Sequence, residues 1–468
     1  MIPYFPKQFS HRATIAYLAS LVLIAIFYWN YFISPVFIFL GMLEVLGFFY
    51  FSFFMSKEWK VFDEKRFSID LFLASLAIRV VWVVFSYFFY IEQTGAPFEW
   101  DVADAMDYHS EAESYCNNYG LSISELPKYY FWLPYSDRGY FYYLSLLYGI
   151  IGPSIVGARL IKALLSAFTV LLVYRFAKRN FGEETGRLSA VFCALMPNLI
   201  YYCGLHMKET EMLFLVLAFL ERADYLLRSQ RMRLLDIFLV IMLTGSLFFF
   251  RTVLGAVAVL SVGAGLLLAP SRWVGIGKKV AVIAFAMLAA VVLSGGVIAT
   301  EVEGVWEDRG SNADAKRTFQ THKGVSWAKY ATGAVMTPII FVVPFATMVD
   351  VDEQYNQQLI HGGAFVKNML GVFVVIALFY LLFKDKTWRK HSLLLVFTAG
   401  YLLVIATSGF SNAERFHIPT LPCLLVLAAY GVTKVNRDNL RFVYMWFFLV
   451  VFMELSWAFF KLGSRGLF

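Results

Sequence analysis

A cluster of carboxylates interrupts a chain that is otherwise dominated by Phe, Leu, Val, Ile and Tyr: EWDVADAMDYHSEAESY, residues 99–115. If 101–115 forms a helix, the three-and-four spacing places five polar side chains on one face: Asp101, Asp104, Tyr108, Glu111 and Tyr115. Like charges at this spacing repel, so a divalent cation, basic partners or a raised pKa must compensate. A carboxylate of raised pKa can act as a general base. Helix capping would explain Asp101 and Asp104 but leaves Glu111 and His109 without a role.

Charged residues also stand at the ends of three apolar segments. They are His206, Lys208 and Glu209 in GLHMKETEMLFL, Arg251 in FFFRTVLG, and Arg415 and His417 in AERFHIPTLP. A charge at membrane depth costs about 2.5–3.5 kcal/mol on insertion scales, so it indicates a function unless the side chain reaches the interface. One long basic side chain can reach the membrane interface easily, but three basic side chains on the same face need an anionic partner. Arginine can grip a phosphate with two hydrogen bonds, which predicts a phosphate site.

The composition places these residues in a membrane protein. Of 468 residues, 60% are hydrophobic and only 16% are charged, far from the balance of a soluble domain. The net charge of +7 does not indicate nucleic-acid binding, because the basic residues lie in short loops between apolar segments. The four cysteines show no metal-binding spacing.

Long apolar segments predict an all-α polytopic fold with about 13 transmembrane helices, since each crossing needs about 20 apolar residues. The predicted spans are 13–32, 34–55, 69–91, 154–177, 188–204, 207–227, 234–250, 252–270, 280–299, 366–383, 392–409, 417–433 and 442–461. Basic clusters at 57–66, 178–187, 228–233, 272–279, 384–390 and 434–441 then all lie in the cytoplasm. This topology puts the N-terminus inside and the C-terminus outside.

The same topology gathers three regions on the extracytoplasmic face: 92–153, 300–365 and 409–419. Residues 330–349 are apolar enough to span, but a span here would reverse the basic cluster at 384–390, and two prolines would break a helix. We expect a re-entrant or interfacial segment that packs against protein. It would form a wall of the substrate groove, and 300–329 would form a lid that excludes water. The predicted organisation is an N-terminal hairpin with its cytoplasmic loop, 1–68, followed by one membrane domain, 69–468.

Three stretches together resemble the GT-C glycosyltransferases, and most closely the branch of protein O-mannosyltransferases and aminoarabinose transferases. They are DVADAMDYHSEA, the long middle segment from GPSIVGARLIKALL to YYCGLHMKET, and RFHIPTLPCLLVLAAYG, within 69–433. The resemblance implies a GT-C-like fold, here preceded by two extra helices. It also implies transfer of a sugar from a polyprenyl-phosphate donor to a lipid, glycan or protein acceptor on the outer face of the inner (plasma) membrane.

The resemblance also implies roles for individual residues. Asp104 matches the catalytic carboxylate best and Asp101 second, because the adjacent Asp-Glu pair of the O-mannosyltransferases is replaced by spaced aspartates. Lys208, Arg251 and Arg415 match the cations that hold the donor phosphate. The remaining candidates, for substrate binding, are Tyr108, His109, Glu111, His206, Glu209 and His417. The only cofactor suggested is a divalent metal ion, with Asp101 and Asp104 as candidate ligands.

Two other functions remain open at this stage. An O-antigen-type polymerase or ligase would use polyprenyl-diphosphate glycans, but it would rely on outer-loop arginines without an acid-rich first loop. A lipid or sugar flippase or transporter would place charges at mid-span and break helices in matching halves. The predicted spans carry few central charges, which favours the transferase.

Overall fold

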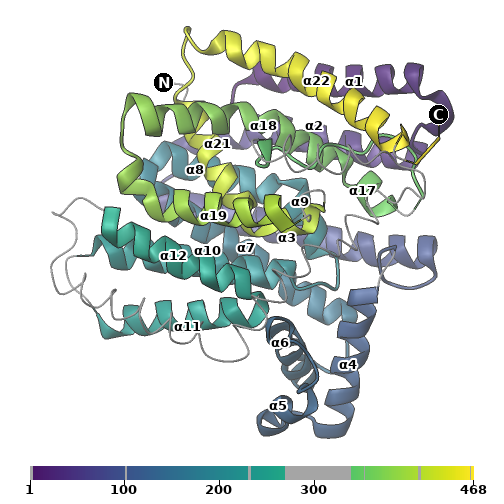
Figure 1. The fold of residues 1–468 in the computed structure, drawn as a ribbon, viewed down its shortest axis with the longest axis vertical. Coiled ribbons are helices and arrows are strands. Elements are labelled where there is room, and N and C mark those ends of the chain that lie inside the picture. Colours follow the sequence, from purple (N-terminus) through teal and green to yellow (C-terminus); the bar gives the residue numbers. More distant parts are fainter. Residues whose placement is uncertain are drawn as a thin grey trace.

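The structure is a computed structural model that describes residues 4–100, 103–229, 233–268, 339–352, 354–408, 413–463 and 465–467. Within these ranges the chain is helical, and the only β-type pairing is an isolated bridge between Phe32 and Val349. The predicted all-α class is therefore confirmed for the described part of the chain. Most helices lie roughly side by side in one bundle, and a small group of helices projects from one corner of it (Figure 1).

The N-terminal part supplies three long apolar helices, α1 (Lys7–Phe27), α2 (Pro35–Glu58) and α3 (Glu64–Thr94). Local signals set the limits of α3. The Asp63 side chain accepts from the Arg66 amide at its start, and Gly95, with φ of 77°, ends it in a left-handed conformation that costs glycine little. Helix α1 packs on α22 (Leu440–Gly463) and α2 on α18 (His361–Phe379), so the N-terminal hairpin is part of the bundle.

The central part contains α7 (Ile155–Phe181), α8 (Glu183–Leu195), α9 (Pro197–Cys203), α10 (Glu209–Arg228), α11 (Leu234–Phe250) and α12 (Thr252–Leu268). The predicted single span 188–204 is thus two helices. The break falls at Met196, whose backbone is extended, and Pro197 follows it. Proline disfavours helical geometry in the preceding residue and has no amide to donate, so one helix ends and another begins there.

The C-terminal part contains α17 (Tyr355–Leu359), α18 (His361–Phe379), α19 (Ser392–Ser408), α20 (Glu414–His417), α21 (Leu421–Thr433) and α22 (Leu440–Gly463). Eight described helical segments are long and apolar enough to cross a membrane, and α11 and α12 are shorter apolar helices. Every predicted span contains helix except 280–299, which lies outside the described residues. A multi-pass membrane protein follows, while the total of about 13 crossings stays a prediction.

The projecting group consists of α4 (Ala103–Tyr119), α5 (Leu126–Tyr129) and α6 (Tyr135–Ile151), at the lower right of Figure 1. The acidic stretch is helical from Ala103 onward, as expected. Its buried face carries Tyr108 and Tyr115, and the Tyr108 ring lies 4.7 Å from that of Tyr140 on α6. Aromatic packing therefore fixes the rotation of α4 and with it the direction of its carboxylates.

Residues 339–349 are not a regular helix, and most of them are buried. Polar side chains of α18 satisfy this irregular backbone. Asn368 Nδ2 donates to the Val342 carbonyl at 2.6 Å, and Lys367 Nζ donates to the Val343 carbonyl at 3.0 Å. Non-helical backbone in a membrane protein is stable when it is packed in protein and hydrogen-bonded in this way. The expected packing against protein is found for 339–349, while their re-entrant or interfacial position stays a prediction. The expected lid at 300–329 lies outside the described residues.

Candidate active site

The site begins with an ion pair between two distant parts of the chain. Asp104 is in the first turn of α4 and Arg415 is in the short helix α20. Arg415 Nη1 donates to Asp104 Oδ2 at 2.6 Å. The Asp104 side chain is 51% exposed and that of Arg415 33%, so the pair is open to solvent and to a ligand. Of the ways in which the charge of the acidic helix could be compensated, a basic partner is present for Asp104.

Arg251 belongs to the same cluster. It lies between α11 and α12, and its Nη1 donates to the Tyr401 hydroxyl of α19 at 3.0 Å. Its guanidinium carbon is 4.7 Å from the centre of the Phe416 ring, and that of Arg415 is 4.9 Å from the same ring. The two guanidinium groups are thus at most about 10 Å apart, each attracted to one aromatic ring.

Lys208 and Glu209 bring the start of α10 to the cluster. Lys208 Nζ donates to Asp137 Oδ1, in the first turn of α6. Glu209 is buried, and its Oε2 accepts no hydrogen bond from any described residue. Its carboxylate acts electrostatically on Lys208, Arg251 and Arg415. Three cations therefore surround one buried carboxylate, with two further carboxylates toward solvent.

Tyr108 shows that the two ion pairs share one site. Burial raises the pKa of its hydroxyl well above the usual range, and the carboxylates of Asp137, Glu209 and Asp104 raise it further. Arg415 acts in the opposite direction. One phenol thus responds to both pairs, and at neutral pH it is a hydrogen-bond donor rather than a phenolate.

Two histidines predicted from the sequence, His109 and His206, lie next to this site and share one tyrosine as a hydrogen-bond partner. The Tyr148 hydroxyl lies 2.7 Å from His109 Nδ1 and 3.2 Å from His206 Nε2. Burial lowers the pKa of His109, with Glu113 opposing it. Burial also lowers the pKa of His206 well below its usual range, and nearby Lys162 and Arg159 reinforce this. Both imidazoles are therefore neutral at pH 7, and through the Tyr148 hydroxyl they connect α4 to the residues just before α10.

Two other predicted residues are placed differently. The Glu111 carbonyl accepts from the Tyr130 hydroxyl at 3.1 Å, and the Glu111 carboxylate acts on Tyr129, the last residue of α5. No interaction of Glu111 with Lys208, Arg251 or Arg415 is found in the described part of the chain. His417 is buried in α20, directly after Phe416. Glu111 thus belongs to the packing of α4 on α5, and His417 to the base of the site.

The predicted metal role of Asp101 and Asp104 stays a prediction, because Asp101 lies outside the described residues. The described residues contain no group of three His, Cys, Asp or Glu side chains placed to hold an ion. Asp104 Oδ2 accepts a hydrogen bond from Arg415, so a positively charged side chain compensates this carboxylate.

Several residues of the site were not predicted from the sequence. Asp137, Tyr401 and Phe416 join it through tertiary contacts. Below α20, Lys367 Nζ lies 3.1 Å from Glu414 Oε2, and Asn198 Nδ2 donates to Glu414 Oε1 at 2.8 Å. All three are buried. The lone lysine in the apolar stretch AFVKNMLG was the one available signal, because a buried cation requires a partner.

One comparison with known proteins gives a match. Residues 139–298 match the family model described as dolichyl-phosphate-mannose-protein mannosyltransferase. No curated protein matches the chain significantly. The matched segment includes Lys208 and Arg251 but neither Asp104 nor Arg415. It confirms the resemblance to the GT-C class and supports membrane glycosyltransferase activity in general terms.

Proposed function

We propose that this protein transfers a sugar from a polyprenyl-phosphate donor to a lipid, glycan or protein acceptor, at the site formed by Asp104, Lys208, Arg251 and Arg415. The observation that carries the proposal is the convergence of these residues from four separate parts of the chain. A family match that includes two of the three cations adds independent support.

The donor phosphate would bind among the three cations. Each already has an oxygen partner: Asp104 for Arg415, Asp137 for Lys208, and the Tyr401 hydroxyl for Arg251. Asp104 and Asp137 are half-exposed residues of the projecting helices, so a phosphate can replace them without uncovering a buried charge. Arginine and lysine can bind the phosphate oxygens directly, with arginine offering two parallel donors.

This exchange would prepare Asp104 for catalysis. In this structure Oδ2 of Asp104 is held by the Arg415 guanidinium. Once Arg415 turns to the donor phosphate, Asp104 can accept the proton of an acceptor hydroxyl. The acceptor oxygen then bonds to the anomeric carbon as the bond from that carbon to the phosphate oxygen breaks. The leaving phosphate keeps the electron pair, and the three cations stabilise its growing charge.

The lipid part of the donor would lie along 339–349, the packed segment expected to form a wall of the groove. Lys367 connects this segment to the site, because its ammonium bonds both the Val343 carbonyl and Glu414, next to Arg415. Helix dimensions and basic loops support a location in the inner (plasma) membrane with the site on the extracytoplasmic side. The divided domain organisation, 1–68 and 69–468, is part of the same proposal.

Donor consumption provides the test, because it does not require the acceptor to be known in advance. The purified protein in lipid nanodiscs is supplied with short-chain polyprenyl-phosphate sugars, and release of the free polyprenyl phosphate is measured. We expect release for at least one sugar and its loss in Arg415→Gln. Arg138→Gln is the matched control, since within the described ranges Arg138 donates only to the backbone carbonyls of Phe131 and Leu133.

Each alternative gives a different result in this assay. Consumption of polyprenyl-diphosphate glycans in place of monophosphate sugars would replace the proposal with a polymerase or ligase. Movement of the intact donor across a proteoliposome membrane, with no cleavage, would replace it with a transporter.

A further inference from the structure

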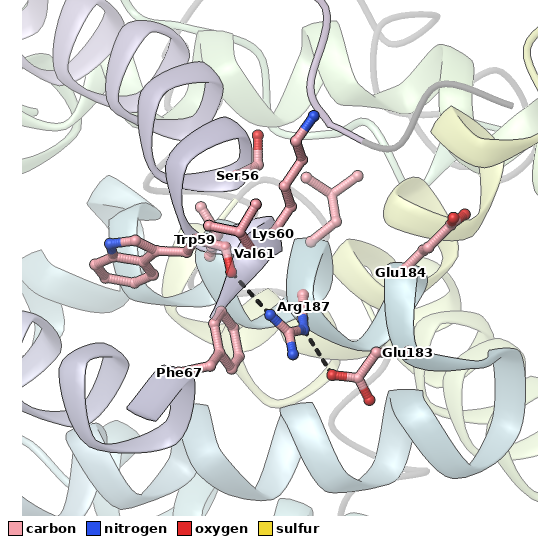
Figure 2. Close-up of a pocket in the computed structure, with 10 residues that line it drawn as sticks. Ser56, Trp59, Lys60, Val61, Phe67, Glu183, Glu184 and Arg187 are labelled. Carbon is pink, nitrogen blue, oxygen red and sulfur yellow. Dashed lines mark hydrogen bonds and ion pairs between the residues drawn. The ribbon is translucent and has the colours of Figure 1, made fainter. Parts of the chain in front are cut away.

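A cavity lies away from the candidate active site. It has a volume of about 390 Å³ and lies where the end of α2 and the start of α3 meet the junction of α7 and α8. Figure 2 shows its lining, with Trp59, Val61 and Phe67 beside Arg187. This volume lies within the range of about 300–1,000 Å³ of small-molecule sites. The proposed transfer reaction does not use this cavity.

Helix α3 separates the two sites. Phe67 near its first turn lines the cavity, whereas its other end leads through Gly95 into the acidic helix α4. With 31 residues, α3 is about 46 Å long, which exceeds the roughly 30 Å of a bilayer core. The cavity therefore lies at the opposite end of α3 from the candidate active site, beside the basic clusters 57–66 and 178–187 that the sequence predicts to be cytoplasmic.

The inner part of the cavity is apolar, and the Arg187 side chain within it already has hydrogen-bond partners. Phe67, Leu188 and Val191 are buried in its wall. Arg187 Nε donates to Glu183 Oε1 at 2.6 Å and its Nη1 to the Trp59 carbonyl at 2.8 Å, as drawn in Figure 2. The Arg187 side chain is thus held in place and presents a cation next to an apolar surface.

The rim carries two opposite charges that do not pair with each other. The Lys60 ammonium lies 5.2 Å from the centre of the Tyr4 ring, and Figure 2 shows it at a different edge of the cavity from the Glu184 carboxylate. Neither Lys60 nor Glu184 forms an ion pair with any residue that the structure describes. Together with Arg187 and Glu183, they give the lining two cations and two anions.

From this arrangement we propose that the cavity binds the headgroup of a zwitterionic phospholipid with a primary ammonium, of the phosphatidylethanolamine type. Lys60 and Arg187 would receive the phosphate, and Glu184 would accept hydrogen bonds from the ammonium. The apolar wall and Trp59 would contact the glycerol and upper acyl chains, at the depth where indoles are common. A singly anionic headgroup would leave Glu184 facing negative charge, and a trimethylammonium group has no N–H to donate to it.

Native mass spectrometry of the intact chain can test this inference, because it resolves individual bound lipids. The detergent-purified protein is titrated with phosphatidylethanolamine, phosphatidylcholine and phosphatidylglycerol of identical acyl chains. We expect the tightest binding for phosphatidylethanolamine. Glu184→Gln and Lys60→Gln should each weaken it roughly tenfold, the loss expected for one charged hydrogen bond.

Glu58→Gln and Lys65→Gln are the matched controls, since both residues are exposed, at the end of α2 and the start of α3, and neither lines the cavity. Equal affinity for the three lipids would overturn the inference, and so would equal losses in the control and test variants. Soluble glycerophosphoethanolamine binding as tightly as the lipid would also overturn it, because the apolar wall would then contribute nothing. None of these results depends on transferase activity.

Discussion

Arg415 donates to Asp104 over 2.6 Å, although 311 residues separate them in the chain. Both side chains are partly exposed, and ion pairs of that kind contribute only about 0–1 kcal/mol to stability. The pair therefore adds little to the fold, and it can exchange partners easily. A phosphate that binds Arg415 would free the carboxylate at the place where an acceptor must lose a proton.

Asp137 offers a direct contrast with Asp104. Both are outer-helix carboxylates paired with a cation of the site, but in our account Asp137 only holds the place of the phosphate at Lys208. Asp137→Asn should leave kcat within a few-fold of the native value and lower the KM for the donor, because competition for Lys208 is removed. Steady-state kinetics at varied donor concentration checks this. A large fall in kcat with unchanged KM would instead make Asp137 a catalytic residue.

Arg251 should act on donor binding through its guanidinium geometry. It reaches the Tyr401 hydroxyl and stacks near Phe416, contacts that a lysine ammonium cannot reproduce together. Arg251→Lys should raise the donor KM roughly 10- to 100-fold, the value of one or two charged hydrogen bonds. Tyr401→Phe removes only the hydroxyl and should have a smaller effect. Equal KM values for native protein and Arg251→Lys would exclude Arg251 from the phosphate site.

The buried pair of Lys367 and Glu414 should be a stability determinant beneath the site. Both side chains are almost fully buried, and Asn198 adds a hydrogen bond to Glu414. Removing one partner leaves a buried charge without compensation, which costs about 3–5 kcal/mol. Lys367→Met should therefore lower the thermal unfolding midpoint strongly, and the double variant Lys367→Met/Glu414→Leu should recover part of the loss.

The more exposed pair of Lys434 and Asp385 provides the control for that experiment. Lys434→Met should change the midpoint little, because solvent screens the remaining charge. If the double variant were no more stable than Lys367→Met, charge compensation would not be the reason for the pair. Specific contacts of Lys367 with the Val343 carbonyl would then be the main contribution.

His206 should make the protein less stable in acid. Its pKa in the folded state is well below the usual value of about 6.5, so the unfolded chain binds the proton more readily. The stability that the neutral His206 imidazole provides is fully present above the usual pKa of about 6.5. It is lost as the pH falls toward the pKa of His206 in the folded state. The thermal unfolding midpoint should be lower at pH 5.5 than at pH 7.5, and His206→Gln should make this difference smaller. His11→Gln, at an exposed position, should not; equal pH profiles for native protein and His206→Gln would contradict this origin.

The sequence predicts the helices well because the length of an apolar segment can be read directly from consecutive residues. Almost every described span was located, and the acidic stretch forms the expected helix. It also predicts Asp104, Lys208, Arg251 and Arg415, since charges at helix ends are conspicuous in an apolar chain. Asp137 and Tyr401 were missed because an aspartate in the first turn of a helix and a tyrosine in an apolar helix are each ordinary. Helical spacing also does not reveal that Glu111 lies beside Tyr129 and Tyr130.

Asp104→Asn is the most direct test of the central claim, that Asp104 is the base of a sugar transfer whose donor is held by Arg415. The substitution keeps the size of the side chain but removes its charge and basicity. Donor binding and single-turnover transfer are measured on the same preparation. We expect donor binding to be retained or tightened while transfer falls by roughly 10²–10⁴-fold, the contribution of a general base. Transfer at a near-native rate with donor bound would contradict the account.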